Sequence, residues 1–208
     1  MANHILRGIW WNGIGWRSSF QSGRELMTTE GSVSIVVPMK VWTPRLHGFR
    51  AKYLQSPRAM IPPHFLILEL SETDRFPGYE TRRLADFIKG LSYELSAFSY
   101  NLSMLDWDEE TQSLGLGPRN ADGFVSIRKR VQKGLNLERN YRDKLYQPRL
   151  LLAANCSKSQ YELEEAFRFM NGDSFSISCR ATEIELYRRQ AGDWLLQESV
   201  PLQESKEN

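Results

Sequence analysis

The stretch IPPHFLIL at residues 61–68 has a counterpart farther along the chain, YQPRLLLA at residues 146–153. Each places a basic residue directly after a proline, His64 in the first and Arg149 in the second, and follows it with a run of apolar side chains. Proline favours an extended backbone in the residue before it, and short apolar runs are typical of buried strands. Both stretches therefore predict strands that the chain enters in an extended conformation.

The remaining hydrophobic patterns predict an α+β fold. Helices are expected over residues 43–54 and 79–95, from Asp122, and from a cap at Ser157 or Ser159 through Met170. Strands are expected over residues 33–37, 64–70, 98–107, 111–116 and 149–155, and residues 175–187 and 194–202 form a closing hairpin across Gly192 and Asp193. Strand and helix blocks occur twice with few parallel β-α-β units, which indicates α+β rather than a dinucleotide-binding fold.

The paired stretches, together with SIVVP at residues 34–38 and the pattern of residues 182–202, resemble the two-histidine (2H) phosphoesterase superfamily. That superfamily includes the 2′-5′ RNA ligase-like and cyclic phosphodiesterase proteins. The resemblance implies two similar sheet-plus-helix lobes around a central cleft, built as one domain over residues 32–202. Residues 1–31, which are rich in tryptophan and glycine, are then expected to form an extension packed on this domain, and residues 203–208 a frayed tail.

The resemblance also implies functional residues, because each family motif carries a histidine and, two residues later, a threonine or serine. Residues i and i+2 of a strand project from the same face, so all four groups would reach the cleft. One imidazole accepts a proton, the other donates one, and the hydroxyls hold the phosphate. Here His64 is retained, but Leu66, Arg149 and Leu151 occupy the other three positions.

Arginine at the second motif changes the expected chemistry. A guanidinium stays protonated near neutral pH, so Arg149 cannot shuttle a proton, but its planar fork binds phosphate or carboxylate through two hydrogen bonds. Loss of one of two acid–base groups typically lowers a rate by about 10²–10⁴. Ordinary phosphodiester hydrolysis is therefore expected to be lost or reduced.

Several functions are compatible with these residues. A divergent 2H-like protein would bind a nucleotide, RNA end or other anionic ligand through Arg149, Leu66 and Leu151. His47 is a further candidate that would border the cleft, for ligand binding or as a second group for proton transfer. An enzyme of altered chemistry would use His64 as its sole acid or base and Arg149 as an anion anchor. The structural alternative is that His64 is bonded to a backbone carbonyl and that both leucines belong to the core.

A third possibility is a protein-interaction module whose contact surface is formed by Trp10, Trp11 and Trp16. Tryptophans among glycines stack on bases in some proteins, but they more often cover a hydrophobic edge of their own domain. A protein partner at the N-terminus and a purely structural role are both compatible with this pattern.

Composition excludes several other classes. The formal charge is +2, with 27 basic and 25 acidic residues, which gives no support for a non-specific nucleic-acid coat protein. Two cysteines in no CxxC arrangement predict a reduced, cytoplasmic setting, and no apolar run approaches the about 20 residues of a membrane helix. His4, His47 and His64 are not spaced as metal ligands, so neither a metal nor another cofactor is expected.

Overall fold

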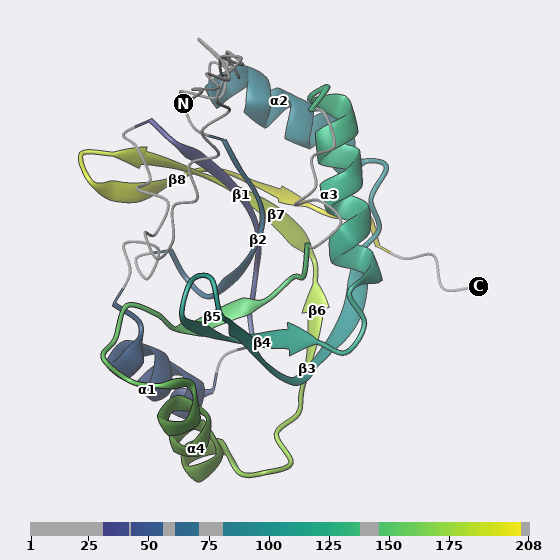
Figure 1. Cartoon of the computed structure of the whole chain (residues 1–208). Helices are drawn as coiled ribbons and strands as arrows, with labels where there is room; N and C mark the ends of the chain where they lie inside the picture. Colours follow the sequence, from purple (N-terminus) through teal and green to yellow (C-terminus); the bar gives the residue numbers. More distant parts are fainter. Residues whose placement is uncertain (1–30, 42, 56–60, 71–80, 138–145, 205–208) are drawn as a thin grey trace, which may run out of the picture.

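The computed structural model describes residues 31–41, 43–55, 61–70, 81–137 and 146–204, and its fold is α+β (Figure 1). The helices are α1 (Pro44–Tyr53), α2 (Thr81–Ser92), α3 (Asp122–Gly134) and α4 (Gln160–Asn171). The strands are β1 (Val33–Pro38), β2 (His64–Leu70), β3 (Phe98–Asp108), β4 (Ser113–Pro118), β5 (Leu150–Ala153), β6 (Ile177–Ala181), β7 (Glu183–Gln190) and β8 (Asp193–Pro201). They form one antiparallel sheet in the order β6-β3-β4-β5-β2-β1-β7-β8.

The sheet consists of two four-stranded halves that meet where β5 pairs with β2. Helices α1 and α4 pack together beside β5 and β4, whereas α2 and α3 pack together against β2, β7 and β8 (Figure 1). Each half of the sheet therefore has its own helix pair. The predicted α+β fold with two sheet-plus-helix lobes is confirmed.

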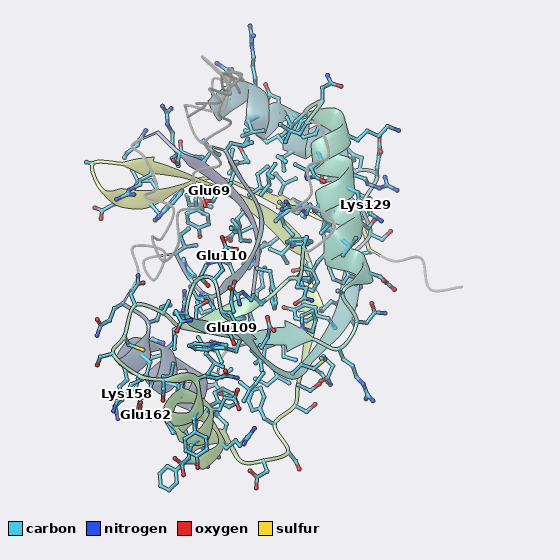
Figure 2. The ribbon with its side chains drawn as sticks, viewed as in Figure 1. Glu69, Glu109, Glu110, Lys129, Lys158 and Glu162 are labelled. Atoms are coloured by element: carbon cyan, nitrogen blue, oxygen red, sulfur yellow. The ribbon has the colours of Figure 1, made fainter. Side chains whose placement is uncertain are left out.

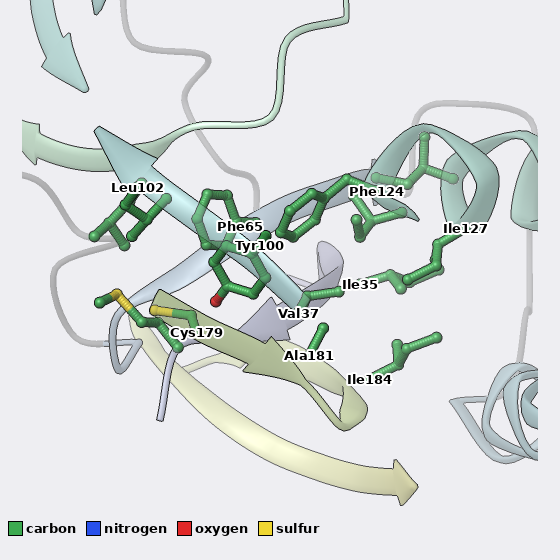
Figure 3. Close-up of a cluster of buried hydrophobic side chains, with 14 of the residues drawn as sticks. Ile35, Val37, Phe65, Tyr100, Leu102, Phe124, Ile127, Cys179, Ala181 and Ile184 are labelled. Carbon is green, nitrogen blue, oxygen red and sulfur yellow. The ribbon is translucent and has the colours of Figure 1, made fainter. Parts of the chain in front are cut away.

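The main core lies on the face of the sheet that carries Phe65 (Figure 3). The Phe65 ring centroid lies 4.5 Å from that of Phe124 on α3 and 5.4 Å from that of Tyr100 on β3. Burial raises the pKa of the Tyr100 hydroxyl far above its ordinary value, and Cys179 of β6 lies beside it (Figure 3). Aromatic pairs at such distances add about 0.5–1.5 kcal/mol each beyond the area that they bury. The cluster thus holds strands of both halves to α3.

The prediction of a single strand over residues 175–187 is wrong. The structure has two strands, β6 and β7, on either side of Thr182. Strand β6 pairs with β3 in one half of the sheet, and β7 pairs with β1 in the other. The side chains that join the main core stand at odd positions up to Ala181 and at even positions in β7, namely Ile184 and Leu186, so the two-residue period changes phase between the strands. The chain therefore crosses from one lobe to the other at this point.

The predicted domain limits can be compared with the structure near both ends of the chain. The expected extension, including its tryptophans, lies outside the described residues up to position 30. Gln203 does not belong to a frayed tail, because its N–H donates to the carbonyl of Leu95 at 2.9 Å and its carbonyl accepts from the N–H of Ala97 at 2.7 Å. No helix within the described residues is long and apolar enough to cross a membrane.

Gly123 near the start of α3 leaves room for the ring of Phe98. A Cβ at this position would overlap the ring, whereas a Cβ at Gly90 of α2 would meet no atom within 4 Å. We expect Gly123→Ala to lower the free energy of unfolding by about 1–3 kcal/mol, because the packed ring has to move. Gly90→Ala is the matched control and should raise it by roughly 0.5–1 kcal/mol, since alanine favours a helix interior. Urea denaturation measures both, and equal effects of the two substitutions would contradict the packing.

Candidate functional site

The approach to β2 fixes the position of His64. Pro62 and Pro63 keep this segment extended, and the carbonyl of Ile61 accepts a hydrogen bond from the buried Arg50 side chain at 3.4 Å. The Nδ1 atom of His64 lies 2.8 Å from the carbonyl oxygen of Pro62, and the residue is 8% exposed. Because a carbonyl only accepts, Nδ1 carries the hydrogen, and in the neutral ring Nε2 is the proton acceptor.

The pairing of β2 with β5 brings the two motif positions together. Phe65 lies opposite Leu150, and continuing this register by one residue places His64 opposite Leu151. Because side chains alternate between the faces of a sheet, the motif residues project from the face opposite Phe65. We call this the His64 face; its motif residues are His64, Leu66, Arg149 and Leu151.

The Arg149 guanidinium is held by two acids on β3. Its Nη2 lies 2.5 Å from an Asp108 carboxylate oxygen, and its Nη1 lies 3.6 Å from Asp106. The same Nη2 donates to the hydroxyl of Ser113 at 3.1 Å and to that of Thr111 at 3.3 Å. The side chain therefore crosses β4 toward β3, away from β2 and His64. An anion that binds Arg149 has to compete with Asp108.

Gly115 makes this path possible. It pairs with Asp106 on one side and with Leu151 on the other, so it lies on the His64 face. A Cβ at Gly115 would lie 3.0 Å from Cδ and 3.2 Å from Cβ of Arg149. Such a close approach over a strand is a common reason for a glycine within it.

Asp108 is kept ionised by its surroundings. Burial alone would raise the pKa of this carboxyl, but hydrogen bonds from Thr111, the charge of Arg149 and the N–H of Glu110 outweigh burial and lower the pKa below its ordinary value. The backbone N–H groups of Glu110 and Thr111 donate to Asp108 at 2.9 and 3.0 Å. Figure 2 labels Glu109 and Glu110 at this turn between β3 and β4. The ion pair with Arg149 is therefore intact at neutral pH.

The other predicted ligand-binding residues differ in their burial and in the face on which they lie. Leu66 and Leu151 are half-buried, so they are neither fully enclosed in a core nor fully open to solvent. His47 lies on the exposed side of α1, whose buried residues include Leu46 and Phe49, and it is not one of the residues that strand pairing brings to the His64 face. Their roles in binding stay predictions.

Sequence reasoning missed the acids on this face. Asp106 and Asp108 stand two residues apart at the end of a predicted strand, and that spacing is the signal that would have placed them on one face. On β7, Glu185 pairs with Val36, which in turn pairs with Leu66, so Glu185 also belongs to the His64 face.

The acids on β7 have their own partners. Burial raises the pKa of Glu185, and the Tyr187 hydroxyl donates to it at 3.0 Å. Glu183, two residues before Glu185, forms an ion pair with Lys40 at 2.9 Å. Among the described residues, no three histidine, cysteine, aspartate or glutamate side chains are grouped so that they could hold a metal ion.

The arrangement of strands and helices matches solved phosphoesterase structures. TT0787 of Thermus thermophilus is 13% identical, with a TM-score of 0.56 over 84% of this chain and 99% of its own. A crystal structure described as a phosphoesterase gives a TM-score of 0.55 at 13% identity over the same shares of both chains. LigT of E. coli in complex with 3′-AMP gives 0.51 at 13% identity, again over 84% of this chain and 99% of LigT.

These likenesses establish the fold. The chain has a 2H phosphoesterase-like fold, as the paired proline-led strands predict. No protein-family model matches the sequence, and no curated protein matches it. The likeness therefore resides in the arrangement of the backbone, and the chemistry of the His64 face has to be argued from its own residues.

The contact between Gly115 and Arg149 can be tested by a double-mutant cycle. We expect Gly115→Ala to lower the free energy of unfolding by about 1 kcal/mol or more, because the new methyl group displaces a side chain whose guanidinium is fixed. The loss should become smaller in an Arg149→Ala background, because alanine removes the Cδ atom of the closest contact but keeps the Cβ atom. Gly117→Ala is the control, since a Cβ there would meet no atom closer than 3.7 Å. Strictly additive effects of the two substitutions, measured by urea denaturation, would show that the side chains do not meet.

Proposed function

We propose that this chain is a divergent 2H-fold protein that binds a nucleotide, RNA end or other anionic ligand on the His64 face, with ordinary phosphodiester hydrolysis lost or reduced. The observation that carries this proposal is the identity of the four residues at the motif positions, which are His64, Leu66, Arg149 and Leu151. His64 and Arg149 come from paired strands, and leucines stand where the family motif has hydroxyls.

We also propose a cytoplasmic location, in keeping with the two free cysteines.

Loss of hydrolysis follows from the proton transfers that these positions can support. Two-histidine chemistry needs one group that accepts a proton and a second that donates one. His64 supplies a group for one of the two steps, but Arg149 stays protonated and is paired with Asp108. The nearby hydroxyls of Thr111 and Ser113 accept hydrogen bonds from Arg149 and therefore hold the arginine.

Ligand binding is supported by the guanidinium and the apolar side chains of the His64 face. A phosphate or a ligand carboxylate offers the guanidinium anionic acceptor oxygens, as Asp108 does, and can replace Asp108 there. The half-buried Leu66 and Leu151 provide apolar surface beside it. Two of the E. coli LigT structures are complexes with 3′-AMP and with phosphate, and we propose the same class of ligand for this chain.

Binding of 3′-AMP, measured by calorimetry, tests the proposal. We expect Arg149→Ala to weaken binding by about 1.5–3 kcal/mol, because a charge-assisted hydrogen bond is removed. Asp108→Asn should strengthen binding, because it removes the competing carboxylate charge. Arg180→Ala is the control, since Arg180 is an exposed arginine on β6 paired with Glu204. If neither substitution near the site alters the affinity, Arg149 is a structural residue and the proposal fails.

A second candidate is an enzyme of altered chemistry with His64 as its sole acid or base. The bond from Nδ1 to Pro62 favours it, because it fixes the tautomer in which Nε2 accepts a proton. In this alternative Arg149 anchors the anionic part of the substrate. An interaction surface at Trp10, Trp11 and Trp16 stays a prediction, since these residues lie outside the described part of the chain.

Hydrolysis of 2′,3′-cyclic AMP separates the two candidates. For the divergent binding protein we expect a rate at least about 10²-fold below that of a two-histidine enzyme. His64→Asn keeps a donor in place of Nδ1 but removes the titratable Nε2. Residual activity that this substitution abolishes, in a protein with unchanged thermal stability, would support the single-histidine enzyme. A rate typical of two-histidine enzymes would refute the loss of hydrolysis.

A further inference from the structure

Helix α4 displays aromatic side chains on the side that faces away from the core. Leu163 and Phe167 are buried, whereas Tyr161 is 73% exposed and Phe169 is 91% exposed. Tyr161 and Phe169 stand eight positions apart, so they lie on one side of the helix about two turns from each other. A single exposed aromatic residue is ordinary, but two on one helix face indicate a contact surface.

The two aromatic residues border a shallow hollow of about 410 Å³. We call it the α4 hollow; its lining residues are Tyr161, Glu164, Glu165, Arg168, Phe169 and Asp173. Arg168 is already paired with Glu164 at 3.3 Å. Within the described part of the chain, Glu165 and Asp173 form no ion pair, so two of the carboxylates that line the hollow are not compensated by a paired cation.

The surface is held in place before any partner arrives. The cap of α4 is reciprocal, with Glu162 accepting from the Ser159 N–H at 2.9 Å and donating its own N–H to the Ser159 hydroxyl. Lys158 also pairs with Glu162 at 2.8 Å, at the start of α4 in Figure 2. On the inner side, Phe167 packs against Phe49 with ring centroids 5.4 Å apart. A helix fixed at its end and on its inner face presents its outer face at little cost in ordering.

We propose that the α4 hollow docks a basic segment of a partner protein, in which arginine or lysine side chains lie on the same face as apolar ones. The charge of Glu165 and Asp173 selects the cations, and the faces of Tyr161 and Phe169 attract both the cations and their aliphatic stems. The same negative charge disfavours RNA and anionic lipid. This proposal is independent of the ligand on the His64 face, because it rests on a different element.

The test uses the full chain and a fluorescein-labelled helical peptide of arginine and leucine, with a glutamate–leucine peptide as the reference. We expect the basic peptide to bind saturably, with an affinity that falls as salt is added. Phe169→Ala and Glu165→Lys should each weaken it at least about tenfold, as expected for residues at the centre of an interface. Matched controls are Tyr93→Ala, which removes another aromatic residue of 77% exposure, and Asp86→Lys, which reverses an exposed charge on α2.

Four results would overturn the proposal. The first is the absence of saturable binding by the basic peptide. The second is a loss of binding in the control variants that equals the loss in Phe169→Ala and Glu165→Lys. The third is self-association in sedimentation that Phe169→Ala abolishes, which would make a second copy of the chain the occupant. The fourth is binding to vesicles of anionic phospholipid that needs Phe169, which would make a membrane surface the occupant.

Discussion

The pairing of β2 with β5 is the interaction on which the rest of the structure depends. It joins the two halves of the sheet at Phe65 and Leu150, which are buried on the core face beneath Phe124. Because side chains alternate across a strand, fixing Phe65 in the core also fixes His64 and its neighbours on the opposite face. A slip of one residue in β5 would turn Arg149 toward the core, and a slip in β2 would expose the Phe65 ring, so the register is strongly specified.

This alternation separates the residues that stabilise the fold from those that determine the chemistry of the His64 face. The core takes every second residue of β2 and β5, and the motif positions are the residues between them. The identities of Arg149 and Leu66 can therefore vary without disturbing the packing of Phe65 and Ile67. The acids on β3 compensate the charge of Arg149, and Gly115 gives its side chain room.

Local signals made much of the fold predictable. Two prolines mark the start of β2, whose predicted range of 64–70 is confirmed, and the Ser159 cap of α4 is present. The partners of Arg149 were not predictable, because Asp108 reaches it only through the pairing of β3, β4 and β5. The phase change at Thr182 was visible in the sequence, but a period of two on both sides made the two strands resemble one.

The charges on the His64 face constrain the kind of ligand that it suits. Asp106 and Asp108 flank it on one side and Glu185 on the other, whereas Arg149 supplies a cation that is already paired. A polyanion that follows the sheet from β3 to β7 would meet these acids in succession, and each unscreened repulsion between like charges opposes binding. A ligand with one anionic group and an apolar or flat body avoids them, since its anion can exchange with Asp108 while its body rests on the leucines. Among the ligands proposed for this face, a mononucleotide or the terminal phosphate of an RNA is therefore favoured over an extended strand.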